Sequence, residues 1–214
     1  MMNENGERGW LSWARELQSI AQAGLTYSQS QYEIERCKQI MEIAAEILAR
    51  QTNAPMEKIR EMFSMEKGYL TPKVDVRGAV FKDDKILLVR EVNDGHKWTL
   101  PGGWADVGAT PAENCEREVF EEAGLRVKAT KLAAVFDRTR HVHDDSIWYI
   151  YKLFFICEVV GGELTPSHET SEARWFAESE LPEESEISIG RSRLYHIQRM
   201  FEHSRNPELP TDYD

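Results

Sequence analysis

Apolar residues recur every three or four positions through the first third of the chain, which is the spacing of one helical face. We expect Gly24 to end a first helix, whose apolar positions are Trp10, Trp13, Leu17 and Ile20. A capping-box signature at Ser28 and Gln31 opens a second helix, whose stripe contains Ile34, Cys37, Met41, Ala44 and Leu48. A third, shorter helix is expected to start near Pro55. Residues 10–70 are therefore predicted to be all-helical.

The period changes at Val74, where apolar and polar residues begin to alternate as they do in a β-strand. The segment before it, residues 68–73, is expected to be a linker. A polar turn at residues 82–85 leads into a second strand at residues 86–89, and this pair predicts a β-hairpin. Later elements are expected to be strands at residues 127–136 and 147–160, a closing helix at residues 190–205 and a frayed tail at residues 206–214.

The composition excludes several classes of protein. The chain has 214 residues and a formal net charge of −11, which argues against non-specific nucleic-acid binding because that needs clustered Lys and Arg. Cys37, Cys115 and Cys157 are an odd, widely spaced set and indicate neither a disulfide framework nor a zinc site. No signal peptide is visible, and no apolar run approaches the roughly 20 residues of a membrane helix. We therefore expect a soluble, cytoplasmic protein with no membrane partner.

Three carboxylates gather in residues 101–125, where a glycine-rich loop leads into a predicted helix. Glu118, Glu121 and Glu122 share one helical face, because each residue advances by about 100° around the axis. Like charges at these spacings cost about 0.2–0.5 kcal/mol each, and Gly124 predicts a nearby helix C-terminus, where the dipole disfavours anions. A segment that breaks two local rules is a candidate functional site. A divalent cation would compensate, because Mg²⁺ prefers oxygen ligands.

This segment resembles the Nudix box, whose pattern is G-x5-E-x7-R-E-U-x-E-E-x-G-U with U aliphatic. Gly103 and the run from Arg117 to Leu125 occupy its fixed positions. The first Glu of the pattern is replaced by Ala109, and in the family that Glu mainly supports the metal ligands. A solvated acidic helix face is the alternative interpretation.

The resemblance implies that the loop and helix hold metal ions, Mg²⁺ with Mn²⁺ as a substitute. It makes Glu118 and Glu122 direct ligands and Glu121 a direct or water-mediated ligand. The carbonyl group of Gly102 is the implied backbone ligand. Arg117 would orient a box carboxylate, and a simple ion pair one turn away along the helix is the alternative for it.

The family often completes its site with one more Glu, which lies in a loop before an aromatic strand and acts as a ligand or general base. Residues 169–176 fit that description. Glu169 is our first choice and Glu172 our second, and the alternative is that both are exposed loop acids. The implied catalytic residues are then Glu118, Glu121, Glu122, Glu169 and Arg117.

Three residues are candidates for substrate binding. Arg77 is placed to direct its guanidinium at a phosphate, although an exposed strand arginine fits the pattern equally well. Trp98 and Trp104 flank the glycine loop, where they can stack on a base or sugar, with ordinary packing as the alternative. Residues 138–146 contain two His and two Asp, and we favour a polar loop, free to act as a substrate lid, over a second metal site.

Residues outside the box narrow the resemblance. The N-terminal Trp-Leu-x-Trp helix and residues 24–28 and 71–77 are similar to a bacterial Nudix subgroup that also lacks the first box Glu. The subgroup implies an α+β Nudix fold, a mixed β-sheet sandwiched between helices, preceded by a small all-helical domain. We expect a helical domain at residues 1–70 and a Nudix domain at residues 71–214, with the box at residues 103–125.

The subgroup hydrolyses CDP-choline and ADP-ribose. The implied activity is a metal-dependent pyrophosphohydrolase that cleaves a nucleoside diphosphate linked to X into a nucleoside monophosphate and phosphorylated X. The alternatives are an RNA-end or dinucleotide pyrophosphohydrolase, a non-catalytic nucleotide-binding Nudix regulator, and a helical assembly module with a vestigial enzyme. The wide apolar stripe of residues 34–48 favours a homodimer through the N-terminal helices over packing on the catalytic domain.

Overall fold

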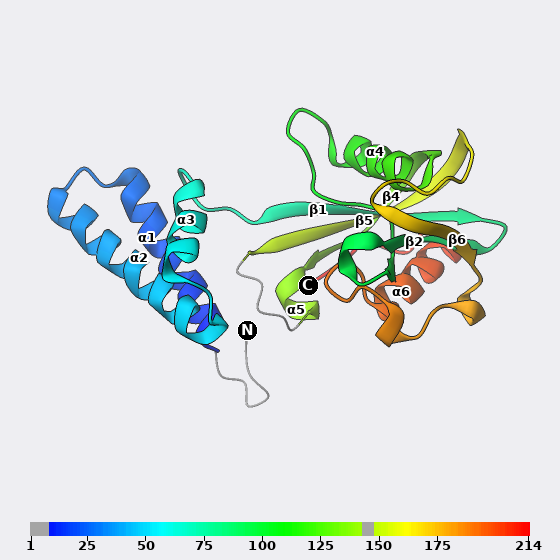
Figure 1. The fold of residues 1–214 in the computed structure, drawn as a ribbon. Coiled ribbons are helices and arrows are strands. Elements are labelled where there is room, and N and C mark those ends of the chain that lie inside the picture. Colours follow the sequence, from blue (N-terminus) through cyan, green and yellow to red (C-terminus); the bar gives the residue numbers. More distant parts are fainter. Residues whose placement is uncertain (1–8, 143–147) are drawn as a thin grey trace. The chain divides into compact units, whose positions relative to one another are not determined.

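Two compact units make up the chain, and the boundary between them falls at Pro72 and Lys73 (Figure 1). The structure, a computed structural model, describes residues 9–142 and 148–214. The first unit is helical and also includes Trp148 and Tyr149, whereas the second contains the β-sheet. The predicted succession of a helical N-terminal region and a mixed sheet with helices, the α+β class, is confirmed.

The helical unit consists of α1 (Trp10–Tyr27), α2 (Gln31–Thr52) and α3 (Met56–Met65). Its core is formed by the buried side chains of Leu11, Ala14, Ala44, Ala45, Leu48, Ile59 and Phe63. The expectation that Gly24 ends the first helix is wrong, because α1 continues to Tyr27. A Cβ atom at Gly24 would lie 2.2 Å from Cys37 Sγ, so the glycine serves the close approach of α1 and α2.

The second helix also begins differently from the prediction. Its N-cap is Ser30, whose hydroxyl accepts a hydrogen bond from the Glu33 amide at 3.5 Å. The expected cap residue, Ser28, instead accepts a hydrogen bond from the Ser30 amide at 3.2 Å. The Ser-x-x-Gln signature therefore lies two residues before the cap that the chain uses.

A seven-stranded mixed sheet forms the second unit. Its strands are β1 (Lys73–Lys82), β2 (Lys85–Glu91), β3 (Lys97–Thr99), β4 (Leu125–Asp137), β5 (Ile150–Gly162), β6 (Thr170–Phe176) and β7 (Asp212–Tyr213). They are ordered β3-β2-β1-β5-β4-β7, and β6 pairs with β2. The β1–β5 and β4–β7 pairs are parallel, whereas the other pairs are antiparallel.

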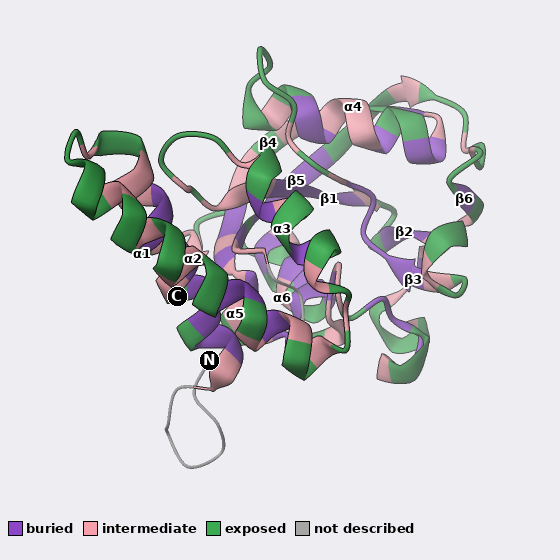
Figure 2. Cartoon of the chain, turned by 60° about the vertical axis from the view of Figure 1, so that its left-hand side comes forward, coloured by how far each residue is buried: buried purple, intermediate pink, exposed green. Residues whose placement is uncertain are grey.

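Helices cover both faces of this sheet, with α4 (Pro111–Ala123) on one side and α6 (Leu194–Arg205) on the other (Figure 1). Alternate residues of the strands supply the two cores. Val76, Val80, Leu87 and Val89 pack with α4, whereas Ala79, Ile86, Leu88 and Phe154 pack with α6. Strand β1 is buried along most of its length, and β5 is buried in its middle, at residues 154–157 (Figure 2). Among the described residues, no helix is long and apolar enough to span a bilayer.

The expectation of a frayed C-terminal tail is wrong. Asp212 and Tyr213 form β7, which pairs with β4. Asp212 accepts hydrogen bonds from Arg199 at 2.5 and 2.9 Å and lies 3.0 Å from His203 Nε2, and the Thr211 hydroxyl donates to the Leu132 carbonyl at 2.8 Å. Polar contacts with α6 and β4 therefore hold the segment in the sheet.

The polar loop after β4 is only partly described. Its first residues form the short helix α5 (Arg138–His141), which the sequence did not predict. His141 Nε2 lies 2.6 Å from Asp214 Oδ1, and Nδ1 contacts the Tyr195 hydroxyl. The lid and the second metal site would both involve residues 143–147, which lie outside the described residues. The remaining connections include the short helices Val92–Asp94, Glu178–Glu180 and Glu184–Glu186.

Candidate active site

Local sequence signals place the box carboxylates on α4. Thr110 caps the helix in a reciprocal capping box with Glu113, with amide-to-side-chain distances of 2.7 and 3.2 Å. Gly124 ends the helix in the left-handed conformation at φ 71°. The helix therefore ends where the sequence predicts, with Glu118, Glu121 and Glu122 in its last two turns.

The glycine loop lies against strand β1. The carbonyl groups of Pro101 and Gly103 accept hydrogen bonds from the amides of Gly78 and Val76, each at 2.8 Å. Gly102 lies between them at φ 144°, and a Cβ atom there would come within 2.0 Å of the Val76 carbonyl oxygen. Only glycine fits this close approach of two backbones.

Glu118 and Glu122 meet this loop from α4. The Gly102 amide donates to Glu122 Oε2 at 2.9 Å. A Cβ atom added to Gly103 would lie 2.8 Å from Glu118 Oε2, so that carboxylate lies directly on the loop. The helix and the loop therefore bring two acids together beside Gly102 and Gly103.

Burial dominates the electrostatics of these two carboxylates. It raises the pKa of Glu122 to about 8, with Arg77 opposing the shift and Glu91 adding to it. Burial also raises the pKa of Glu118, against the neighbouring guanidinium of Arg117. Both acids therefore lie where negative charge is disfavoured, which a bound cation would reverse.

Arg117 connects three carboxylates. Its Nη2 lies 2.8 Å from Glu118 Oε1 and 3.1 Å from Asp106 Oδ2, and its Nη1 lies 2.6 Å from Glu121 Oε2. The contact with Glu118 agrees with an orienting role, and the pair with Glu121 is the simple helix pair that was its alternative. Glu121 is half-exposed and does not lie on the glycine loop in this arrangement.

The two loop acids have different surroundings. The Glu169 carbonyl accepts from the Val92 amide at 2.9 Å, and the next residue, Thr170, is buried and donates to the Glu122 carbonyl at 2.6 Å. Glu172 instead lies within β6 and pairs with Arg90 at 3.6 Å. Glu169 is therefore the loop acid next to the box, and its role as ligand or base stays a prediction.

The predicted substrate residues differ in burial. Arg77 is 1% exposed and donates to Asp75 at 2.8 and 2.6 Å and to the Leu100 carbonyl at 3.2 Å. The alternative of an exposed strand arginine is therefore wrong. Burial works against its charge, but Asp75 holds the pKa of Arg77 above its usual range. Trp98 is 5% exposed and packs edge-on against Phe176, with ring centroids 5.0 Å apart.

Trp98 therefore fits the packing alternative, and Arg90 and Arg174 also lie over its ring. Trp104 is 49% exposed, so its ring is accessible beside the glycine loop. Stacking of either ring on a substrate stays a prediction.

Glu91 is a buried acid that the sequence analysis missed. It ends β2, is 2% exposed, and lies close enough to Glu122 and Glu169 for their charges to interact. Burial raises its pKa, Arg191 and Arg77 oppose the shift, and Glu169 adds to it. The available signal was the spacing along β2, because Glu91 follows Leu87 and Val89 at steps of two residues and so falls on the face that α4 covers.

The donor atoms of the site determine which metal ion it could hold. Within residues 9–142 and 148–214, no three His, Cys, Asp or Glu side chains lie close enough together to hold a metal ion. Glu118 and Glu122 do converge, and they offer only oxygen donors. The loop beside them follows a backbone path that only glycine allows at Gly102. That donor chemistry fits Mg²⁺ or Mn²⁺, with Arg117 as the competing cation.

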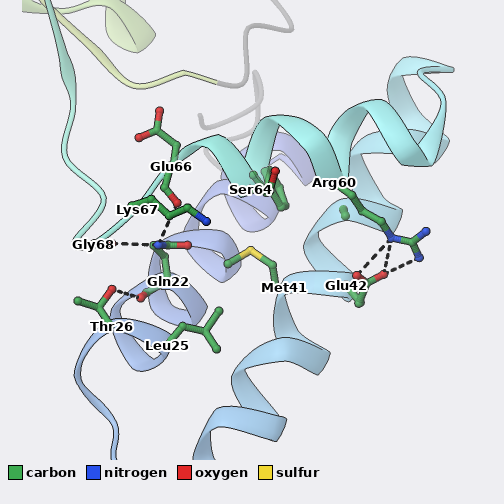
Figure 3. Close-up of a pocket in the computed structure, with 12 residues that line it drawn as sticks. Gln22, Leu25, Thr26, Met41, Glu42, Arg60, Ser64, Glu66, Lys67 and Gly68 are labelled. Atoms are coloured by element: carbon green, nitrogen blue, oxygen red, sulfur yellow. Dashed lines mark hydrogen bonds and ion pairs between the residues drawn. The ribbon is translucent and has the colours of Figure 1, made fainter.

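A separate cavity of about 470 Å³ lies in the helical unit (Figure 3). All its lining residues come from that unit, and none belongs to the box. Among its lining residues, the side-chain amide of Gln22 donates hydrogen bonds to the Glu66 and Gly68 carbonyls at 3.3 and 3.0 Å. Arg60 forms an ion pair with Glu42 at 2.7 Å. This cavity is therefore not the candidate catalytic site.

Known proteins resemble the whole chain. A family model described as "UDP-X-like, N-terminal oligomerisation domain" matches residues 8–63, and a NUDIX domain model matches residues 71–196. YjhB of Bacillus subtilis (strain 168), provisionally named an ADP-ribose pyrophosphatase, is 38% identical over 205 residues, covering 96% of this chain and 97% of YjhB.

Two solved structures are similar as well. The crystal structure of a UDP-X diphosphatase has 28% identity and a TM-score of 0.61, covering 96% of this chain and 98% of that one. The structure of an ADP-ribose pyrophosphatase from Streptococcus suis 89-1591 has 36% identity and a TM-score of 0.60, covering 67% of this chain and all of that one. With the acids of the box assembled on α4 and the glycine loop, this chain belongs to the Nudix hydrolase family.

Proposed function

We propose that this Nudix hydrolase cleaves nucleoside diphosphates linked to X, of the ADP-ribose or CDP-choline type, into a nucleoside monophosphate and phosphorylated X. The observation that carries the proposal is the convergence of Glu118 and Glu122 on the loop at Gly102 and Gly103. The names of YjhB and the Streptococcus suis protein support ADP-ribose, and that of the UDP-X diphosphatase supports a diphosphate linked to a variable group.

Glu118, Glu121 and Glu122, with the Gly102 carbonyl, are the residues that would hold Mg²⁺ or Mn²⁺. A bound cation neutralises the diphosphate charge and lowers the pKa of the attacking water. Glu121 must leave Arg117 to join the other two acids, and its half-exposed position allows that movement. Arg117 retains Glu118, 2.8 Å away, and so fixes the orientation of that carboxylate.

Glu169 is our candidate for the general base. It is half-exposed, whereas the neighbouring Thr170 is fully buried and hydrogen-bonded to the box helix. This position lets Glu169 reach a water near Glu122 while its backbone stays fixed. Glu172 is the second choice, because its carboxylate faces Arg90 across the sheet.

Substrate recognition divides between a buried and an exposed group. Arg77 would need to give up Asp75 to bind a phosphate directly, so it acts first by holding the Leu100 carbonyl beside the glycine loop. Trp104 follows Gly103 and has a half-exposed ring, which suits stacking on a base. Trp98 contributes packing, so the aromatic contact that would favour the choline cation rests on Trp104.

A homodimer through residues 1–70 completes the proposal, with residues 71–214 as the catalytic domain. The matched model is described as an oligomerisation domain. In agreement, the helical unit leaves large apolar side chains exposed, including Trp13 at 53%, Ile20 at 55% and Ile43 at 52%. An apolar surface of this kind is typical of a protein interface.

A substrate panel with product analysis tests the activity. ADP-ribose, CDP-choline, UDP-linked sugars, a dinucleotide and RNA with a 5′-triphosphate would each be incubated with enzyme and Mg²⁺ or Mn²⁺. We expect AMP or CMP with the phosphorylated second moiety from the first two substrates. Faster release from the dinucleotide or RNA would favour the alternative pyrophosphohydrolases, and nucleotide binding without turnover would favour the regulator.

A further inference from the structure

Strand β2 points its last residue at the box helix. Leu87 and Val89 pack in the core with Val119 and Ala123 of α4. Successive strand residues alternate between faces, so Glu91 continues the row that α4 covers. Its burial at 2% exposure agrees with this placement. An acid thus occupies the position where the strand pattern would place another apolar residue.

An irregularity in the sheet occurs at the same residue. The pairing of β2 with β6 shifts between Arg90 and Glu91, so that Arg90 lies opposite Glu172 and Glu91 lies opposite Thr170. The extra residue, Ser171, lies in β6, and bulges of this kind are frequent next to active sites. Thr170 also donates its hydroxyl to the Glu122 carbonyl at 2.6 Å. Thr170 therefore links the backbone of Glu91 to the backbone of Glu122 on α4.

The carboxylate of Glu91 is poorly satisfied for so buried a group. Its Oε1 forms an ion pair with Arg191 Nη1 at 3.0 Å, but this atom has no hydrogen-bond partner among the described residues. Buried polar atoms are normally hydrogen-bonded, and each exception calls for an explanation. Neighbouring acids Glu122 and Glu169 increase the unfavourable charge.

Arg191 comes from a turn that is fixed to β3. The Ser188 amide donates to the Trp98 carbonyl at 2.8 Å, and the hydroxyl groups of Thr99 and Ser192 are 3.1 Å apart. The side chain of Arg191 is about one-third exposed, in contrast to its buried partner. It can therefore move away from Glu91 while its backbone remains in place.

We propose that Glu91 is a further carboxylate of the divalent-cation site, drawn in from β2 beside Glu122 when the cation binds, and that Arg191 neutralises Glu91 when no cation is bound. The proposal rests on the proposed function, because it assumes that the box acids bind a divalent cation. A bound cation would take over the neutralisation of Glu91 and free Arg191 for another anion, such as a substrate phosphate.

Calorimetric titration of the metal-stripped, full-length protein with Mn²⁺ tests this directly and needs no substrate. We expect Glu91→Gln to weaken Mn²⁺ affinity by roughly tenfold to a hundredfold, the range typical of carboxylates that support a metal site. Arg191→Gln should leave the affinity unchanged or increase it, because the competing cation is gone. Glu180→Gln is the matched control. Glu180 is an exposed acid 3.7 Å from Lys85, so this variant should bind Mn²⁺ with the affinity of the wild type.

Three results would overturn the proposal. Glu91→Gln that binds Mn²⁺ within twofold of the wild type would remove Glu91 from the site, and equal weakening by Arg191→Gln would make the pair merely structural. Thermal unfolding without metal checks that each variant folds, and Glu91→Asp, which keeps the charge, should recover part of the affinity. A wild-type protein that binds no Mn²⁺ sinks this proposal, whereas one that binds Mn²⁺ but cleaves no tested substrate contradicts only the proposed function.

Discussion

At the scale of single residues, Arg117 is the group that pairs with the carboxylates of the box when no cation is bound. It contacts Glu118, Glu121 and Asp106 at distances of 2.6–3.1 Å, and its side chain is 34% exposed. Partly exposed ion pairs of this kind are worth about 0–1 kcal/mol each. A divalent cation can displace so weak a partner, so Arg117 holds the acids in place without preventing them from becoming ligands.

Glu118→Gln should leave the fold intact and lower turnover by about 10²–10³ through loss of a ligand or base. The amide has the same shape, and removing a charge that burial disfavours should not lower the melting temperature. Steady-state kinetics with Mg²⁺, together with thermal unfolding, measure both effects. Glu122→Gln should behave similarly, and a near-normal kcat in either variant would contradict the site assignment.

Glu169→Gln should reduce kcat more than Glu172→Gln does. The first residue precedes Thr170, which is bonded to the box helix, whereas the second is paired with Arg90 on the sheet. Parallel kinetics on the two variants, with the melting temperature as a control for folding, provide the comparison. The reverse order would mean that the acid within β6, and not the one before it, serves the reaction.

At the scale of helices and strands, the sequence pattern predicted the features that depend on residues close together in the chain. The alternation in β1 is real because its two faces meet α4 and α6, so both sets of side chains are constrained. The predicted helix end at Gly24 failed because the need for close packing against Cys37 overrode the local signal of a glycine. Strand β7 was missed because two residues cannot show a period and their partners lie in α6 and β4.

Strand β7 should make the protein sensitive to acid. The hydrogen bond from Arg199, against the effect of burial, lowers the pKa of Asp212 from 3.8 to about 2, and His203 adds to the lowering. A depressed carboxyl pKa contributes stability that is fully present above pH 3.8 and is lost as the pH falls towards 2. At about 1.4 kcal/mol per pKa unit the full shift would correspond to about 2 kcal/mol, and solvent screening of the partly exposed Arg199–Asp212 pair reduces the contribution to about 1 kcal/mol.

Asp212→Asn should therefore lower the free energy of unfolding by roughly 1 kcal/mol at pH 7 and flatten its dependence on pH between about 4 and 2. Urea unfolding at pH 7 and at pH 3 provides the measurement. Glu208→Gln, in the same segment, is the matched control and should change neither value. Equal stability of Asp212→Asn and the wild type at pH 7 would show that the tail contributes nothing to the sheet unit.

At the scale of the whole molecule, the part of the site that is contiguous in sequence could be predicted. Contacts that folding creates between distant segments could not. Glu118 and Glu122 were found because their loop and helix are adjacent in sequence. Glu91 comes from another strand, and its burial depends on α4 and on the turn that carries Arg191. Burial likewise decides between packing and recognition for Trp98, and no local pattern reports it.

The dimer is the prediction that concerns the molecule as a whole. Light scattering should find the full-length protein dimeric at micromolar concentration, and removal of residues 1–68 should leave a monomeric, aggregation-prone domain. If the full-length protein is monomeric, the apolar helices have no partner chain and the dimer proposal is wrong.

A single substitution separates assembly from folding. Ile43 is 52% exposed on α2, so Ile43→Asp should leave the helical content and melting behaviour of the dissociated chain intact while weakening the dimer by at least tenfold. The physical reason is that an unpaired charge in an apolar interface loses its hydration without gaining a partner. Glu35→Gln, on an exposed part of the same helix, should leave the dimer unchanged. Sedimentation across a concentration series measures dissociation directly, and an unaltered dimer in Ile43→Asp would place the interface on another face of the helices.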